Sequence, residues 1–375
     1  MSVKRSTLDK LTDKQKSLLT QFAYINYDID KYEEIVKNKK ITISELETII
    51  KSANIPYLGN VAKKITGIQI TPKEIMQEIK DSGLGNLEIK EILQDRNTGF
   101  FAVAIKDENE NKGMIFRGTE VSNIRDLITD SITDAKEYIV DDAMQVQQAK
   151  QFYDKNKSEE GLNYLYGHSL GGNLVEHIYL KEYEDVKNAF VINPNHINQD
   201  LISTEEQIQA FNNQEKFNCV VTGGDWVSEL KECDLYKNNI RYIENNKKLK
   251  NNILSEHAIE TATFDKEGNF KITTKEQAYR WHRHNMQRFF TKAIAKSGNV
   301  LKNIYGKLTG SLESKKEEIK ALPEGKKERN IREDYMLENF KTEDRTFDVE
   351  KAYKNLSTIV IKENNCEKNS EEKVH

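Results

Sequence analysis

The chain has 375 residues, a formal net charge of −4, and 31% charged residues. This length allows one large domain with an extension, or two domains. Its 16 tyrosines and 14 phenylalanines can supply a packed core, which excludes a wholly disordered chain. The net negative charge also disfavours a general nucleic-acid binder, so any basic surface must be local.

The cysteines and the apolar segments narrow the class of protein further. Cys219, Cys233 and Cys366 lack the spacing of a disulfide framework or a zinc site, so we expect free thiols. Residues 1–11 contain no apolar core of a signal peptide, and no apolar run approaches the ~18 residues of a spanning helix. We therefore expect a cytoplasmic protein, or one secreted by a system that needs no signal peptide.

The first 85 or so residues have mostly helical patterns. Leucine and phenylalanine recur near helical spacing over residues 8–24, where Thr12 and Gln15 form the signature of a capping box. The same signature recurs at residues 42–45 and 71–74, and in the second case a proline stands at the favoured first helical position.

From residue 99 onward the pattern changes to short β-rich runs. Two such runs flank the polar segment 107–112 and predict a β-hairpin. A calcium loop in this segment would need glycine and glutamate where the chain has Lys112 and Gly118, so we expect no metal there. Alternating elements follow: a helix over 141–152, a strand over 163–166, a helix over 173–183, a strand over 189–192, a helical linker and a strand over 217–222. Such alternation predicts a parallel sheet.

The sequence GHSLGG at residues 167–172 stands between a short apolar strand and an amphipathic helix. This context is typical of a nucleophile elbow, in which a strained serine, here Ser169, is lifted off the sheet. Gly167 and Gly171 occupy the two positions where side chains would clash. The N–H of Leu170 and the dipole of the following helix would face the negative charge of a tetrahedral intermediate.

A serine nucleophile needs a base, and the base needs an orienting carboxylate; in this type of sheet the chain order is serine, acid, histidine. Asp225 directly follows the predicted strand 217–222 and a Gly-Gly bend, and is the predicted acid. His257 lies at a loop-to-helix junction after the strand-like residues 240–243 and is the predicted base, with His282 as its main rival. Less suitable positions are held by Asp200, Asp234, Asp265, His168, His177, His196 and His284.

Several segments together resemble the class 3 (fungal-type) lipases and their bacterial lipase-like relatives, which have the α/β-hydrolase fold. These segments are MIFRGTE (114–120), DLITD (126–130), GHSLGGNL (167–174), GGDWV (223–227) and EHAIET (256–261). The resemblance covers roughly residues 8–265 and implies that Thr119 supplies an oxyanion-hole donor together with the N–H of Leu170. The family usually has Asp-Trp where this chain has Asp126-Leu127, and its base commonly lies farther from its acid.

Beyond about residue 270 two further helical stripes are accompanied by a local excess of positive charge. Residues 271–310 hold nine Lys or Arg and one acid, a charge of +8, so the rest of the chain carries −12. This segment is expected to pack on the acidic body, to bind an anionic membrane surface, or to dock an export or immunity partner. The membrane option follows from this charge and from the interleaved Tyr279, Trp281, Phe289 and Phe290. The last option is what the resemblance implies, since similar bacterial lipases with an added helical region include effectors that are exported without a signal peptide. Residues 363–375 are a predicted disordered tail.

We therefore predict an α/β-hydrolase domain over residues 1–270, built on a mostly parallel sheet with flanking helices, and a basic helical extension over 271–375. The predicted reaction is hydrolysis of carboxylic esters of glycerolipids by Ser169, without a metal or organic cofactor. The alternatives are a short-chain esterase or thioesterase, a catalytically silent hydrolase scaffold that acts as a binding protein, and an interaction module in which only the extension matters.

Overall fold

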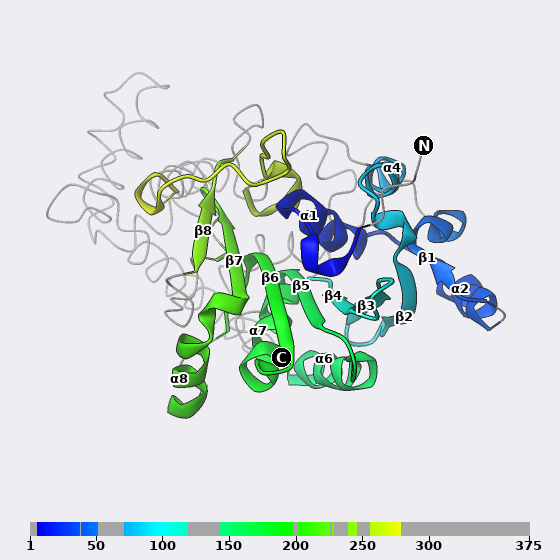
Figure 1. The fold of residues 1–375 in the computed structure, drawn as a ribbon, viewed down its shortest axis with the longest axis horizontal. Coiled ribbons are helices and arrows are strands. Elements are labelled where there is room, and N and C mark those ends of the chain that lie inside the picture. Colours follow the sequence, from blue (N-terminus) through cyan, green and yellow to red (C-terminus); the bar gives the residue numbers. More distant parts are fainter. Residues whose placement is uncertain are drawn as a thin grey trace, which may run out of the picture. The chain divides into compact units, whose positions relative to one another are not determined.

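An eight-stranded mixed sheet forms the centre of the computed structural model (Figure 1). The structure describes residues 6–37, 39–51, 71–118, 143–197, 202–225, 227–228, 239–245 and 256–278, which all belong to one compact unit. No helix within these ranges is long and apolar enough to cross a membrane. The predicted extension lies almost wholly outside them, so its helical character and the boundary at residue 270 stay predictions.

The strands lie side by side in the order of the chain. They are β1 (Ile41–Thr42), β2 (Glu88–Gln94), β3 (Phe101–Lys106), β4 (Lys112–Phe116), β5 (Asn163–Ser169), β6 (Val186–Pro194), β7 (Phe217–Thr222) and β8 (Ile240–Ile243). Neighbouring strands are antiparallel from β1 to β4 and parallel from β4 to β8. The predicted hairpin and the predicted parallel sheet are both confirmed.

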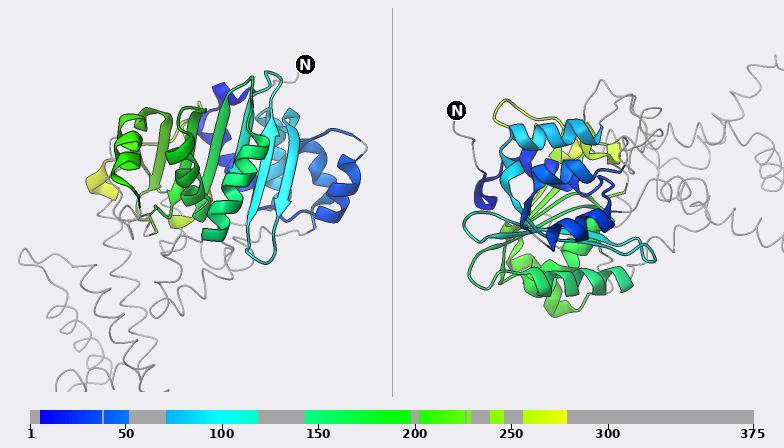
Figure 2. Two further views of the ribbon diagram at one scale, coloured as in Figure 1. Left: turned by 90° about the horizontal axis from the view of Figure 1, so that it is seen from below. Right: turned by 90° about the vertical axis from the view of Figure 1, so that its right-hand side faces the viewer.

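Helices cover both faces of the sheet (Figure 2). They are α1 (Asp13–Phe22), α2 (Ile29–Val36), α4 (Pro72–Asp81), α6 (Ala143–Asn156), α7 (Leu170–Glu182) and α8 (Thr204–Asn212), with short 3-10 turns at Leu8–Lys10, Ile43–Ile49, Leu84–Asn86, Gln214–Lys216 and Ile259–Thr261. In Figure 2 the N-terminal helices α1 and α4 lie on one side of the sheet, and α6 and α7 lie on the other. Both faces of the central strands are therefore buried, which matches their continuous apolar runs.

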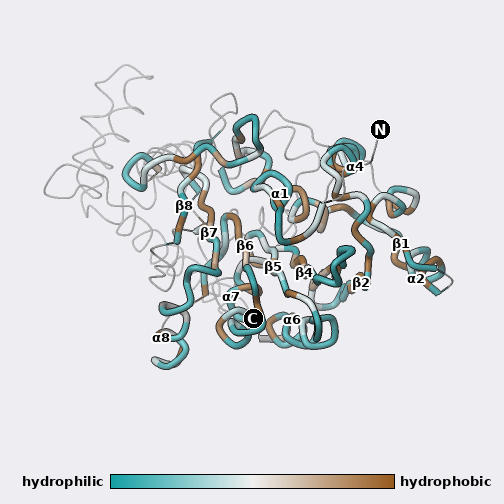
Figure 3. Tube along the Cα trace, in the orientation of Figure 1, coloured by the Kyte–Doolittle hydropathy of each residue, from teal (hydrophilic) through white to brown (hydrophobic). Residues whose placement is uncertain are grey.

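Hydropathy follows this layering. The strands β6 and β7 carry hydrophobic stretches, whereas α8 is hydrophilic along most of its length (Figure 3). All seven residues of β5 are buried, including its polar end. Buried polar groups require hydrogen-bond partners. In open α/β sheets the functional site usually lies at the carboxyl ends of the strands, where the polar end of β5 is found.

Local capping confirms the predicted helix starts. Thr12 and Gln15 form a capping box at α1, and Thr71 and Glu74 form one at α4. The signature at residues 42–45 also forms its capping box, but it begins a 3-10 turn. The sequence did not predict β2, because its Glu, Lys and Leu content favours a helix; a register shift between Ile89 and Glu91 also breaks its alternation.

A partly buried ion pair joins the start of α1 to the sheet. The two carboxylate oxygens of Asp13 accept hydrogen bonds from the guanidinium of Arg241 on β8, at 2.9 and 3.0 Å. The backbone N–H of Phe270 donates to the same carboxylate at 3.2 Å. Such a bidentate pair fixes both the distance and the orientation of the Asp13 carboxylate relative to the Arg241 guanidinium. It thereby fixes the start of α1 against β8; Tyr24, in the segment after α1, is buried.

Candidate active site

The junction of β5 and α7 has the backbone of a nucleophile elbow. Ser169 ends the strand with φ 56° and ψ −128°, and Leu170 begins the helix. A non-glycine residue with positive φ outside the left-handed helical region is strained, and it persists only where its surroundings enforce it. The helix starts three residues earlier than the predicted residue 173, so the N–H of Leu170 belongs to its first turn, where backbone donors lack intrahelical partners.

Close backbone contacts explain the two glycines of the elbow. A Cβ atom on Gly167 would lie 2.3 Å from the carbonyl oxygen of Gly171. A Cβ atom on Gly171 would lie 2.1 Å from the carbonyl oxygen of Phe116, at the end of β4. Real Cβ contacts are never this short, so larger residues would push β4, β5 and α7 apart.

The mostly parallel sheet with helices on both faces, and this elbow between β5 and α7, decide the fold. The chain has an α/β-hydrolase fold.

The end of β4 borders the serine directly. A Cβ atom on Gly118 would lie 2.8 Å from Cβ of Ser169, so the main chain of Gly118 packs against the serine side chain. The neighbouring Arg117 is buried, with its guanidinium over the ring of Phe101 at 4.6 Å. Thr119, the expected oxyanion donor, lies outside the described residues.

Asp225 and His257 come together as a buried hydrogen-bonded pair. Nδ1 of His257 lies 2.9 Å from Oδ1 of Asp225, and both side chains are essentially inaccessible to solvent. Since a carboxylate only accepts, Nδ1 of the imidazole carries the proton and Nε2 is left as the basic nitrogen. The structure therefore brings together the acid and the base that the sequence predicts from chain order.

The environment of Asp225 keeps its carboxyl ionised. Burial by itself raises the pKa of this carboxyl, but the adjacent His257 and its hydrogen bond lower it. Hydrogen bonds from the Ser228 hydroxyl at 2.7 Å and the Val227 N–H at 3.2 Å act in the same direction, and the net pKa lies below the ordinary value. Sequence reasoning did not find Ser228, which has no signal beyond its place three residues after the acid.

The imidazole of His257 lies beside the elbow. Its ring centroid is 4.8 Å from that of His168, the residue before the serine. Within the described residues, the hydroxyl of Ser169 makes no hydrogen bond to the imidazole of His257. A nucleophile and its base need not be hydrogen-bonded before substrate binds.

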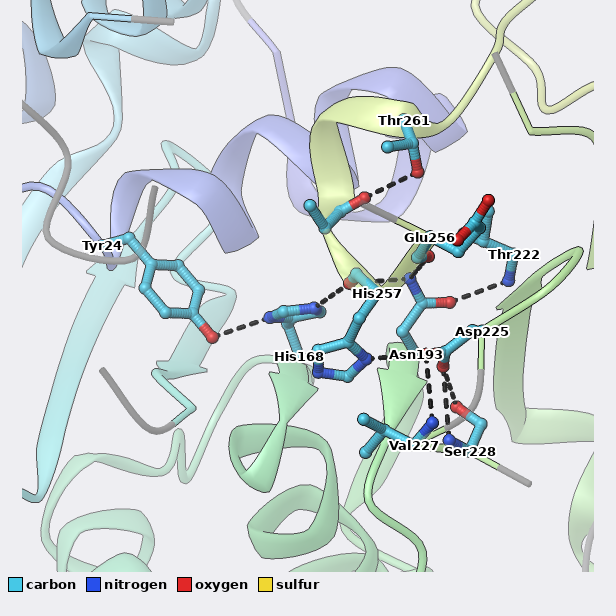
Figure 4. A network of polar contacts seen from close by, with 11 residues as sticks. Tyr24, His168, Asn193, Thr222, Asp225, Val227, Ser228, Glu256, His257 and Thr261 are labelled. Atoms are coloured by element: carbon cyan, nitrogen blue, oxygen red, sulfur yellow. Dashed lines mark hydrogen bonds and ion pairs between the residues drawn. The ribbon is translucent and has the colours of Figure 1, made fainter. Parts of the chain in front are cut away.

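Asn193, a second residue absent from the sequence prediction, ties two strand ends to the histidine (Figure 4). It is the penultimate residue of β6, with φ 47°, and its Oδ1 accepts a hydrogen bond from the N–H of Thr222 at 2.7 Å. Its Nδ2 donates to the carbonyl of His257 at 3.0 Å and to that of Glu256 at 3.3 Å. Asn193 thus fixes the main chain of the base to the ends of β6 and β7.

The other acid and base candidates stand elsewhere. His196 is buried against Glu176 of α7, with Nδ1 2.6 Å from Oε1, and the second oxygen of Glu176 accepts the N–H of Ile197. Asp265 is exposed and caps a turn by accepting the N–H of Asn269. The rival base His282 lies outside the described residues, as do Asp200, Asp234 and His284.

The described residues contain no cluster of three or more His, Cys, Asp or Glu side chains that could hold a metal ion. The hairpin segment that resembles a calcium loop uses its aspartate differently. The carboxylate of Asp107 accepts hydrogen bonds from the backbone N–H groups of Leu8, Asn109 and Asn111. It therefore closes the hairpin and anchors the start of the chain.

Comparisons with known proteins give matches only at the level of structure. No protein-family model and no curated protein matches the chain. Similar solved structures include a deletion mutant of Rhizomucor miehei lipase in its propeptide complex (15% identity, 46% of this chain, 60% of that chain, TM-score 0.29). Others are a triacylglycerol lipase from Penicillium expansum (15%, 53% and 78%, TM-score 0.29) and Lip2 lipase from Yarrowia lipolytica (14%, 59% and 82%, TM-score 0.27). At this level of similarity, the assignment of fold rests on the chain's own topology and elbow.

Proposed function

We propose that the protein is a serine-dependent carboxylic ester hydrolase that acts on glycerolipids, as a lipase or a phospholipase A. The observation that carries the proposal is the buried Asp225–His257 pair, whose imidazole lies beside a strained serine elbow. A strained serine costs free energy, and so does burial of a charged carboxylate. Their occurrence together, in the chain order of a hydrolase, favours catalysis over a purely structural role.

In the proposed mechanism Ser169 attacks the ester carbonyl while Nε2 of His257 takes its proton. Asp225 holds the imidazole in the required tautomer and stabilises its cation. The N–H of Leu170, with Thr119, would stabilise the oxyanion of the tetrahedral intermediate. His257 then returns the proton to the leaving alcohol, and an acyl ester remains on Ser169. Water, activated by the same histidine, releases the carboxylic acid and restores the serine.

Glycerolipid esters are the favoured substrates because the elbow, the RGT strand end and the GGDWV segment together resemble lipases. A short-chain esterase or thioesterase would use the same residues. A silent scaffold that only binds a partner would need none of them to react. The +8 charge of residues 271–310 would favour anionic lipid surfaces, at ~1 kcal/mol for each engaged Lys or Arg. Docking of an export or immunity partner is the other proposed role of this extension.

The test is hydrolysis by the purified full chain of three substrates side by side: phospholipid vesicles, a triacylglycerol emulsion and a soluble short-chain ester. A fluorophosphonate probe applied in parallel reports whether the serine is activated. Preferred hydrolysis of either lipid supports the proposal. Turnover of the short-chain ester alone supports the esterase alternative, and a chain that neither reacts with the probe nor hydrolyses any ester is a binding protein.

A further inference from the structure

Tyr24, in the segment after α1, points its hydroxyl toward His168 at the edge of the candidate site (Figure 4). Its side chain is buried, and its hydroxyl lies 2.7 Å from Nδ1 of His168. The same hydroxyl accepts a hydrogen bond from the backbone N–H of Gly118 at 3.0 Å. One phenol thus contacts the end of β4 and the residue before the candidate nucleophile, although 144 positions separate Tyr24 from His168.

The proton positions in this chain of hydrogen bonds follow from its far end. Nε2 of His168 lies 2.8 Å from the carbonyl oxygen of His257, and a carbonyl only accepts, so Nε2 carries a proton. Burial lowers the pKa of His168 to about 3, so its imidazole is neutral at physiological pH and Nδ1 has a lone pair. The Tyr24 hydroxyl therefore donates a hydrogen bond to Nδ1, and its oxygen accepts the hydrogen bond from the N–H of Gly118.

Three segments of the reaction centre are joined by these bonds. Gly118 packs against the side chain of Ser169, His168 precedes that serine, and His257 is the candidate base. The main chain of His257 is held from two sides, since its carbonyl accepts from both His168 and Asn193. Without the phenol hydroxyl, the N–H of Gly118 and the Nδ1 of His168 would lose a shared buried partner.

We propose that Tyr24 and His168 are positioning residues, which hold the end of β4 and the main chain of His257 in register with Ser169. The pair acts through Gly118 and the carbonyl of His257, not through the reacting atoms. The inference rests on the proposed ester hydrolysis and adds to it a requirement for two residues outside the candidate triad.

Tyr24→Phe removes the hydroxyl and leaves the ring in place, and Tyr27→Phe is the matched control. Tyr27 lies in the same segment and is equally buried, but its hydroxyl donates to the carbonyl of Phe22 at 3.2 Å. We expect Tyr24→Phe to lower kcat on a soluble ester about tenfold with little change in KM, because a small misplacement of reacting groups is costly. Tyr27→Phe should stay close to wild type.

Titration of active sites with a fluorophosphonate separates positioning from loss of structure. A variant that is merely less well folded contains fewer reactive serines, each with normal turnover. A positioning defect lowers turnover and labelling rate for each titrated site.

A second pair of variants tests the same inference independently. His168→Gln retains an amide that can donate to the His257 carbonyl, and it should keep more turnover per titrated site than His168→Leu.

The inference is overturned if Tyr24→Phe and Tyr27→Phe have equal turnover per titrated site. If Tyr24→Phe fails to fold, equal turnover of His168→Gln and His168→Leu overturns it instead. A wild-type chain that neither labels nor hydrolyses any ester refutes the proposed function itself, and the inference falls with it. That result differs from an active wild type with unaffected variants, which refutes the inference alone.

Discussion

His168 should make the protein sensitive to acid, and the effect can be isolated by comparing the wild type with His168→Gln. The imidazole is fully buried, accepts a hydrogen bond from Tyr24 and donates one to a carbonyl, so an imidazolium ion does not fit this site. Its pKa is lowered from 6.5 to about 3, chiefly by burial. Between these two values the unfolded chain binds a proton that the folded chain does not.

This difference in bound protons fixes the direction in which the unfolding free energy changes with pH. The contribution of neutral His168 to stability is complete above the unfolded pKa and is lost as the pH falls from about 6.5 toward about 3. Each pH unit well inside this window costs about 1.4 kcal/mol of unfolding free energy. Between pH 7 and pH 5 the loss through His168 amounts to about 2 kcal/mol.

Urea denaturation of both proteins at pH 7 and pH 5 measures the loss. Other groups titrate in this range, including Glu260, whose pKa burial raises to about 7. Their contributions cancel in the difference between the wild type and His168→Gln, which retain the same groups. We expect the wild type to lose about 2 kcal/mol more than the variant. Equal losses would refute a neutral, buried His168.

Three further changes test other parts of the site. Asp225→Asn should lower kcat on the order of 10⁴-fold, because an amide no longer selects the required tautomer of His257; activity within tenfold of wild type would exclude Asp225 as the acid. Asn193→Ala leaves the buried N–H of Thr222 without its acceptor and should lower the unfolding free energy by about 1–3 kcal/mol in urea, where no change would contradict its bridging role. A chain ended after residue 278 should keep turnover of a soluble ester and lose activity on anionic vesicles, less so at high salt; equal vesicle activity would exclude a membrane role for the extension.

The elbow was predictable because its requirements are local. Gly167 and Gly171 are demanded by contacts within the strand, the turn and the adjoining strand end, and such steric needs are written into a few consecutive residues. Asp225 and His257 were predicted from the chain order that this type of sheet imposes, and the structure places the two side chains within hydrogen-bond distance of each other. Their catalytic roles stay predictions.

Tyr24 and Asn193 had no comparable signal. Each acts through contacts to residues far along the chain, and a tyrosine near the end of an amphipathic helix, or an asparagine at a strand end, is common in sequences of this kind. The strand β2 was missed for a different reason. Its local propensity favours a helix, and only pairing with β3 and the packing of the sheet make it extended.

The central claim is that Ser169 is a nucleophile activated by His257. The most direct measurement is mass spectrometry of the intact protein after reaction with a fluorophosphonate, followed by mapping of the modified peptide. We predict a single adduct on Ser169 that is absent in Ser169→Ala and forms much more slowly in His257→Ala, with both variants folded. An adduct on another residue, or an unchanged rate of labelling in His257→Ala, would contradict the claim.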